Sequence, residues 1–313
     1  MFHIIIPTYN REKTIIRSIN SVLNQKNKDW IIYIIDDWST DNTKNILKTY
    51  LEKYKWKIFY TYKENWWVWS ARNIWIEQAL KNSNDFKNDW VIFLDSDDEL
   101  VKDALNKIVN ILNKYKWYKI YFFDSIDEKW NIYSTINKDY EIINYKRWLK
   151  WFRDCWFTIN LKLFKNRNYR FYEKVNWWES SLWNKIFKEN NKIWIFVKWH
   201  TTIKIFLTRN SLCRVWSRNY KWLWNSYNVL KKLLQDFWED YKKLQPQKYW
   251  QLNIQYAEYL ALKWKRLSSI KFIKGIKYNR NIKSILLYTI SLIDYKFKIQ
   301  NFLIKWMGNR VKK

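Results

Sequence analysis

The sequence predicts an α/β fold in which helices flank a mainly parallel sheet. Short apolar runs alternate with segments of helical periodicity along the first 100 residues, and this alternation is typical of βαβ units. The chain has 313 residues, of which 28% are charged and 48% hydrophobic. It can therefore bury a large core, and its composition is that of a globular protein. In such sheets, ligands bind at the carboxyl ends of the strands.

Four strands and three helices are expected in this first part of the chain. The opening apolar run ends at Pro7, as a buried strand that leads into a turn would. From Ile15 to Leu23 the apolar side chains recur at helical spacing, and the later segments repeat the two patterns. In chain order, the expected strands are 2–6, 30–35, 57–62 and 90–94, and the expected helices are 12–24, 43–54 and 70–81.

The pattern changes at about residue 120. Two short strands, 120–124 and 131–135, flank a linker from Asp127 to Asn131. This linker suits a hairpin turn if residue 130 has the conformational freedom of glycine, and Trp130 makes it awkward. From about residue 211 onward the chain is helical and basic. We therefore expect one domain over residues 1–210 and a basic helical extension over residues 211–313.

The formal net charge of +29 favours anionic partners such as nucleic acids, anionic lipid head groups or phosphorylated substrates. A composition rich in Lys, Asn and Ile is also what an AT-rich genome produces. The two cysteines, Cys155 and Cys213, are too few for a disulfide framework and lack metal-ligand spacing. We find neither a secretory signal nor an apolar run of the roughly 18 residues that a membrane span needs. The expected location is the cytoplasm.

Glycine is almost absent from this chain. There are 2 Gly and 25 Trp, and the first glycine is Gly275. Together, the two residue types make up roughly 9% of the chain, close to the ordinary glycine share of about 7%. Some bacterial lineages read the codon UGA as glycine. Translating such a gene with UGA as tryptophan would give this composition, and we adopt as a hypothesis that most of the tryptophans are glycines.

Four polar motifs follow the expected strands. They read Ile-Pro-Thr-Tyr-Asn at 6–10, Asp-Asp-Trp-Ser at 36–39, Asn-Trp-Trp-Val-Trp-Ser-Ala-Arg-Asn at 65–73 and Asp-Ser-Asp-Asp at 95–98. In this order and spacing they resemble the family 2 glycosyltransferases, which have the GT-A fold. The family usually has glycine where this chain has Trp38, Trp66, Trp67, Trp69 and Trp75. Trp30, Trp90 and Trp183 stand where aromatic residues are normal, so we expect these three to be packed.

The resemblance implies an inverting hexosyltransferase that moves a sugar from a nucleotide-sugar donor, a UDP-sugar, to a hydroxyl group. Its acceptor would be a glycan or a lipid-linked glycan in cell-surface polysaccharide synthesis. Residues 1–125 would form the nucleotide-sugar half and residues 126–210 the acceptor half. By the same resemblance, the donor would be bound by Thr8, Tyr9, Asp36, Asp37, Arg72 and Asp95.

A divalent metal ion is expected at the end of the fourth strand. A diphosphate leaving group needs its charge neutralised, and a hard cation held by carboxylates does this. Asp95 and Asp97 place two carboxylates on one side of the turn, which suits Mg²⁺ or Mn²⁺.

The catalytic base is expected further along the chain. Family members carry a Glu-Asp pair that deprotonates the acceptor hydroxyl. The matching segment here has Glu179, but Ser180 replaces the aspartate that usually acts as the base. Either Glu179 is the base, or the register slips and Glu173 serves, or the enzyme is impaired. His200 lies too far from the segment where many relatives have a histidine, and we expect no catalytic role for it.

Three other functions compete with that of a transferase. A catalytically impaired relative that binds sugar nucleotides is kept open by Ser180. A nucleic-acid-binding protein would explain the charge but not the ordered carboxylate motifs, so we expect no nucleic-acid partner. A nucleotidyltransferase would need a glycine- and arginine-rich loop, which residues 7–13 lack. The basic, amphipathic region from 259 to 313 favours peripheral binding to an anionic membrane surface, at the inner face of the cell membrane.

Overall fold

The structure, a computed structural model, describes residues 1–63, 68–133, 136–150, 156–166, 169–171, 179–190, 194–198, 203–205 and 220–262. The chain divides into two compact units. The first unit consists of Met1–Trp148, Phe152–Lys174 and Leu182–Leu207 and holds both sheets. The second consists of Leu149–Trp151, Val175–Ser181 and Thr208–Lys313, and its described part includes α9 (Tyr220–Leu244) and α10 (Pro246–Leu262), which pack on each other.

The larger sheet has eight strands within the described residues, in the order β3-β2-β1-β4-β10-β6-β11-β9. β1 pairs in parallel with β2 and β4, and parallel pairs also join β2 to β3 and β6 to β11. β10 and β9 run antiparallel to their neighbours. The predicted mainly parallel sheet is confirmed. The strands are β1 (Phe2–Thr8), β2 (Trp30–Asp37), β3 (Ile58–Lys63), β4 (Trp90–Phe93), β6 (Ile120–Phe123), β9 (Tyr140–Ile143), β10 (Trp156–Asn160) and β11 (Trp194–Val197).

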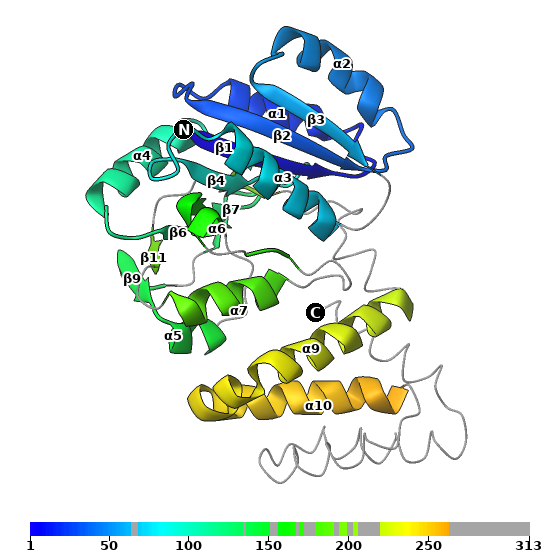
Figure 1. Ribbon diagram of the computed structural model, residues 1–313, viewed down its shortest axis with the longest axis vertical. Helices are drawn as coiled ribbons and strands as arrows, with labels where there is room; N and C mark the ends of the chain where they lie inside the picture. Colours follow the sequence, from blue (N-terminus) through cyan, green and yellow to red (C-terminus); the bar gives the residue numbers. More distant parts are fainter. Residues whose placement is uncertain are drawn as a thin grey trace. The chain divides into compact units, whose positions relative to one another are not determined.

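Helices cover both faces of this sheet. α1 (Ile15–Leu23), α2 (Thr43–Lys53) and α4 (Ala104–Lys114) share one core with alternate residues of β1 and β2. α3 (Val68–Asn82) packs on the opposite face and lies in front of β1, β2 and β4 in Figure 1, with α1 behind them. Because side chains alternate along a strand, β1 is apolar on both faces, as strands buried between two layers of helices are.

The expected elements before residue 100 all form, with shifted ends. α1 begins at Ile15, three residues later than expected, because the carbonyl of Arg11 accepts the amides of Thr14 and Ile15 in the preceding turn. β1 continues through Pro7 to Thr8, since a proline near a strand end removes only one donor from the ladder. Several later elements were not predicted, among them α4, α5 (Tyr145–Lys150), α6 (Lys162–Asn166), α7 (Glu179–Glu189), β9, β10 and β11.

The expected pairing of strand 120–124 with strand 131–135 is wrong, because residues 120–123 form β6 of the large sheet. The hairpin around residues 127–131 does form, and its two strands lie at one end of a second, smaller sheet. Within the described residues its order is β5-β12-β7-β8. β7 (Ser125–Ile126) and β8 (Ile132–Tyr133) pair antiparallel, and β5 (Glu99–Leu100) and β12 (Ile203–Lys204) complete the sheet. Across the described residues, every helix falls short of the length and apolar character that a bilayer-spanning segment requires.

Two tryptophans occupy turn positions that suit glycine. In the hairpin, Asp127 Oδ1 accepts the amides of Lys129 and Asn131 at 2.8 and 2.9 Å, and Trp130 between them has φ of 64°. A three-residue hairpin loop usually has glycine at this left-handed position. Trp38, at the turn after β2, has φ of 71°. Trp130 is 71% exposed, with the Lys204 ammonium 5.4 Å from its ring centroid, and Trp38 is 40% exposed. A strained backbone of this kind costs about 1–3 kcal/mol at each site.

The tryptophans expected to be packed behave differently. Trp30 and Trp183 are 3% and 5% exposed, and the half-buried Trp90 packs edge-on against Tyr121. Trp75, which stands where the family has glycine, is also fully buried, edge-on to Phe93 at 4.8 Å. Because Trp75 lies within a helix, its backbone needs no positive φ, and its position lacks the signature of Trp38 and Trp130.

A buried polar network joins β1 and β2 to the residue that precedes β4. His3 is fully buried, with Nδ1 3.1 Å from the hydroxyl of Tyr33 and Nε2 3.3 Å from Asp89. Asp89 also accepts a hydrogen bond from Ser83. Burial lowers the pKa of His3 below its ordinary value of 6.5, although the hydrogen bond to Asp89 opposes this shift. His3 is therefore neutral in the folded protein at neutral pH.

The sign of this shift predicts a pH dependence of stability. A histidine whose pKa is lower in the folded state stabilises the protein above its unfolded pKa of about 6.5 and loses that contribution as the pH falls below it. We expect the free energy of unfolding, measured with urea, to fall between about pH 7 and pH 5, and the His3→Gln variant to lose part of that slope. Equal slopes in the two proteins would contradict the assignment.

Candidate functional site

The polar residues predicted from the motifs lie at one edge of the large sheet. Thr8 ends β1, Asp36 and Asp37 end β2, and Asp95 and Asp97 follow β4. β1 lies between the other two strands, and Thr8 is in register with Asp36. Because the three strands are parallel, their carboxyl ends meet at the same edge. The structure thus brings these residues to one region, as the sequence predicted.

Asp36 shapes the turn that follows β2. Its side chain is fully buried, and Oδ1 accepts the amide of Ser39 at 2.8 Å while Oδ2 accepts the hydroxyl of Tyr60 at 2.8 Å. Burial, and then the hydrogen bond to Asp36, raise the pKa of Tyr60, which therefore keeps its proton for this bond. Both oxygens of Asp36 are already engaged inside the protein.

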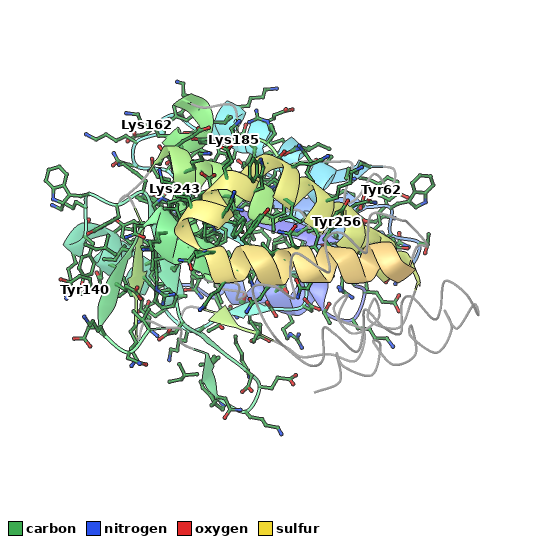
Figure 2. The ribbon with its side chains drawn as sticks, turned by 90° about the horizontal axis from the view of Figure 1, so that it is seen from below. Tyr62, Tyr140, Lys162, Lys185, Lys243 and Tyr256 are labelled. Carbon is green, nitrogen blue, oxygen red and sulfur yellow. The ribbon has the colours of Figure 1, made fainter. Side chains whose placement is uncertain are left out.

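Asp37 is the more accessible carboxylate of the pair. It is in register with Lys63 at the end of β3, and the lysine ammonium group donates a hydrogen bond to Asp37 Oδ1. The neighbouring Tyr62 is 44% exposed and projects outward from β3 (Figure 2), and the ammonium of Lys44 lies 5.3 Å from its ring centroid. Asp37 thus lies at the buried end of β2, next to the basic and aromatic side chains at the end of β3.

The loop after β1 is held against the turn after β2. The amide of Asn10 donates to Ser39 Oγ at 2.8 Å, and Asn10 Oδ1 accepts the amide of Thr40 at 2.8 Å. Asn10 adopts φ of 51°, which asparagine tolerates better than most residues. Tyr9, between this loop and β1, is 45% exposed. Two of the motif loops therefore form one bonded surface.

α1 fixes the backbone of the loop after β4. Arg17 donates to the carbonyl of Asp97 at 2.6 Å, and Ser18 Oγ donates to the carbonyls of Asp98 and Asp95 at 2.6 and 3.3 Å. Leu100 closes the loop through its amide, which donates to a serine hydroxyl on the same helix. With its carbonyls bound by the helix, this loop presents its carboxylates from a fixed backbone.

The two carboxylates predicted to bind metal are accessible. Asp95 is exposed, and the Asp97 side chain is 15% exposed, with Oδ2 3.6 Å from Arg11 Nη2. In the described part of the chain, no group of three or more His, Cys, Asp or Glu side chains is arranged to bind a metal ion. Two carboxylates alone still fit Mg²⁺ or Mn²⁺ in a phosphate-binding site, since such ions take their remaining ligands from phosphate oxygens and water.

The remaining predicted residues are only partly described. Arg72 lies in α3 and Glu179 is the first residue of α7, but the side chains of both lie outside the described residues. Glu173 and His200 lie outside them entirely, and so do Trp66, Trp67, Trp177 and Trp178. The side chains of Trp69 and Ser180 are not described either.

The structure adds four residues that the motifs did not indicate: Arg11, Arg17, Tyr60 and Lys63. Each of them either neutralises the charge of a predicted carboxylate or fixes its position. Lys63 could have been found, because it ends the third parallel strand and so falls at the same edge. Arg11 directly follows the Thr-Tyr-Asn motif, but its pairing with Asp97 across 86 residues has no local signal.

Comparison with known proteins agrees with this architecture. The model of the family described as glycosyl transferase family 2 matches residues 3–167. A GalNAc(5)-diNAcBac-PP-undecaprenol beta-1,3-glucosyltransferase of Campylobacter jejuni is 29% identical over 304 residues, which cover 93% of each chain. The putative teichuronic acid biosynthesis glycosyltransferase TuaG of Bacillus subtilis is 40% identical over 105 residues, 33% of this chain and 38% of its own.

Solved structures share the fold. TarS of S. aureus in complex with UDP-GlcNAc has a TM-score of 0.59 at 17% identity, over 94% of this chain and 80% of its own. The mannosyltransferase PcManGT of Pyrobaculum calidifontis, in complex with GDP-Man and Mn²⁺, has a TM-score of 0.55 at 14% identity, over 98% of this chain and 85% of its own. The fold is GT-A-like, and with a family model that matches more than half of its length, the chain belongs to glycosyl transferase family 2.

Proposed function

We propose that this protein is an inverting glycosyltransferase that moves a sugar from a UDP-sugar to a hydroxyl group of a lipid-linked or cell-surface glycan. The observation that carries the proposal is the convergence of Thr8, Asp36, Asp37, Asp95 and Asp97 at the carboxyl edge of β1, β2 and β4. The relative from C. jejuni, similar along nearly the whole chain, is named for a polyprenyl-diphosphate-linked acceptor, and TarS was solved with UDP-GlcNAc. Both support this donor and acceptor class.

In this proposal, the nucleoside and ribose lie along the first three motif loops. Asp37, the less buried of the two aspartates, accepts a hydrogen bond from the nucleobase, and Asp36 stabilises the turn next to Asp37. Thr8 and the exposed Tyr9 contact the nucleoside, and Arg72 of α3 lies near the nucleobase. The division into a nucleotide-sugar half (1–125), an acceptor half (126–210) and a helical extension (211–313) belongs to the same proposal.

Asp95 and Asp97 would bind Mg²⁺ or Mn²⁺, which, when present, neutralises charge on the leaving diphosphate. Their accessible carboxylates and the fixed backbone of their loop fit this role. PcManGT and GalNAc-T7, two structural relatives, were solved with Mn²⁺.

The first test removes one metal carboxylate. Asp97→Asn keeps the size of the side chain and leaves the carbonyl that Arg17 binds, so the fold should persist while metal-dependent transfer from a UDP-sugar falls by roughly 10²-fold or more. Transfer is measured as UDP release over a panel of donors with Mn²⁺. Asp85→Asn, in the turn before β4, is the matched control and should keep full activity. Near wild-type turnover of Asp97→Asn would show that the metal assignment is wrong.

The acceptor hydroxyl needs a base, and we propose Glu179 at the start of α7. Its carboxylate takes the hydroxyl proton while the hydroxyl oxygen bonds to the anomeric carbon. As that bond forms, the bond from the same carbon to the diphosphate oxygen breaks on the opposite face, and the diphosphate leaves with the electron pair. Ser180 next to it supports one alternative, a relative that binds sugar nucleotides but transfers slowly.

Paired substitutions decide the base. Glu179→Gln should lower turnover by roughly 10²- to 10⁴-fold with donor affinity little changed, because a glutamine cannot take the proton. Glu173→Gln is the register control and should keep near wild-type turnover. The reverse pattern would move the base to Glu173. Binding of UDP-sugar without turnover in the wild-type protein would favour the impaired relative.

We further propose that the protein is cytoplasmic and binds peripherally to the inner face of the cell membrane. The net charge is +29, and a lipid-linked acceptor would lie in an anionic surface that attracts basic segments. Sedimentation with vesicles of anionic lipid at low and high salt tests this part, and absent or salt-independent binding would contradict it.

We also propose that most of the tryptophans are encoded by UGA and are glycines in the native protein. The positive φ and exposed indoles of Trp38 and Trp130 support this, because glycine alone adopts such conformations at no steric cost. A nucleotide loop also needs bare backbone close to its ligand, which an indole would block.

The gene and the protein test this proposal separately. UGA is expected at the codons for Trp38, Trp66, Trp67, Trp69, Trp130, Trp177 and Trp178, and UGG at the codon for Trp183. In protein made with tryptophan throughout, Trp130→Gly should raise the free energy of unfolding by about 1–3 kcal/mol, since a strained backbone is relieved. Trp30→Gly, the control, should lower it, because a buried ring is lost. UGG at most of the seven codons would refute the proposal.

A further inference from the structure

Arg11 has a fixed backbone, and its guanidinium faces the carboxylate of Asp97. Its amide donates to Thr43 Oγ1 at 2.9 Å, and its carbonyl accepts the amides of Thr14 and Ile15 at 3.0 Å each, at the start of α1. Its guanidinium lies 3.6 Å from Asp97 Oδ2, and the two side chains are 19% and 15% exposed. Arg11 therefore directs a positive charge from an anchored position onto a carboxylate that the proposed function gives to a metal ion.

This contact differs in kind from that of the neighbouring arginine. Arg17 donates a hydrogen bond to the carbonyl of Asp97 at 2.6 Å, a distance at which hydrogen bonds are strong, and its guanidinium also forms an ion pair with Glu99 at 2.9 Å. The 3.6 Å between Arg11 and Asp97 exceeds hydrogen-bonding distance, so charge attraction alone joins them. Arg17 thus holds the loop in place, whereas the Arg11 side chain can leave Asp97 without breaking a hydrogen bond.

We propose that Arg11 is a cation placeholder: it neutralises Asp97 when no divalent cation is bound, and it turns to the diphosphate of the donor when the cation takes Asp97. The inference rests on the proposed metal role of Asp95 and Asp97. A guanidinium and a divalent cation cannot share one carboxylate without repelling each other. A diphosphate offers the displaced guanidinium new acceptor oxygens of the right geometry.

The exchange couples the two ligands. Without a nucleotide, the metal ion must displace Arg11 from Asp97 and so binds weakly. With a nucleoside diphosphate present, the displaced guanidinium gains a new partner, and the metal ion binds more tightly. Because such coupling is reciprocal, the metal ion strengthens nucleotide binding by the same factor. The site would then bind the metal ion and the donor together, and between turnovers Arg11 would neutralise the charge of Asp97.

Binding of Mn²⁺, with and without UDP, tests the exchange without any turnover. Free Mn²⁺ is followed by electron paramagnetic resonance in titrations of the full chain. Arg11→Gln should bind Mn²⁺ alone about five- to tenfold more tightly than the wild type and lose most of the enhancement by UDP. Arg11→Lys, which keeps the charge, should behave nearly like the wild type. Arg147→Gln, which breaks the ion pair between Arg147 of α5 and Glu141 of β9, is the control and should change neither quantity.

The outcomes separate this inference from the metal assignment. If Arg11→Gln binds Mn²⁺ alone no more tightly than the wild type, or keeps the full UDP enhancement, the placeholder role is overturned while the metal site stands. If the wild type fails to bind Mn²⁺ even with UDP, or Asp97→Asn binds it as well as the wild type, the metal assignment and the placeholder role both fall.

Discussion

The site depends on the parallel pairing of β1 with both β2 and β4. Thr8 is in register with Asp36, and the same strand also carries the loop that reaches Asp97 through Arg11. Parallel strands are joined by crossover connections. Here α1 connects β1 to β2, and α3, on the opposite face, connects β3 to β4. The helices that make the pairing possible also serve the site, since α1 binds the backbone of the loop after β4. Core packing and site geometry are therefore parts of one arrangement.

Concentrating carboxylates at one edge creates an electrostatic cost that the neighbouring side chains offset. Asp36 is fully buried and stabilised by two hydrogen bonds, Asp37 pairs with Lys63, and Asp97 pairs with Arg11. Leaving a buried carboxylate without such partners would cost several kcal/mol. The partners differ in strength, from the enclosed hydrogen bonds of Asp36 to the loose pairing of Asp97. The most firmly bonded carboxylate, Asp36, shapes the turn after β2, and the most loosely paired one, Asp97, is the residue proposed to exchange its partner during binding.

The sequence predicted the first half of the fold well, because periodicity and strand-end motifs are local signals. The strands from β1 to β4 and their helices form where expected, and the motif carboxylates share the expected edge. The insertion of β10 between β4 and β6 has no such signal, since an antiparallel strand from residues 156–160 reaches its place through tertiary pairing. Arg11, Tyr60 and Lys63 were missed for a related reason: each acquires its role only from the partner that the sheet brings to it. The tryptophan anomaly was visible in the sequence, and its physical form at Trp38 and Trp130 appears only in the backbone angles.

A crystal structure of the protein with UDP and Mn²⁺ tests the central claim most directly, which is that the carboxyl edge of β1, β2 and β4 binds the donor. The account predicts that the nucleotide lies across this edge, with the base beside Asp37 and the metal ion bound by Asp95 or Asp97 and by diphosphate oxygens. A nucleotide bound elsewhere on the chain would contradict the account. So would a nucleotide bound at this edge if neither Asp95 nor Asp97 contacts the metal ion or the diphosphate.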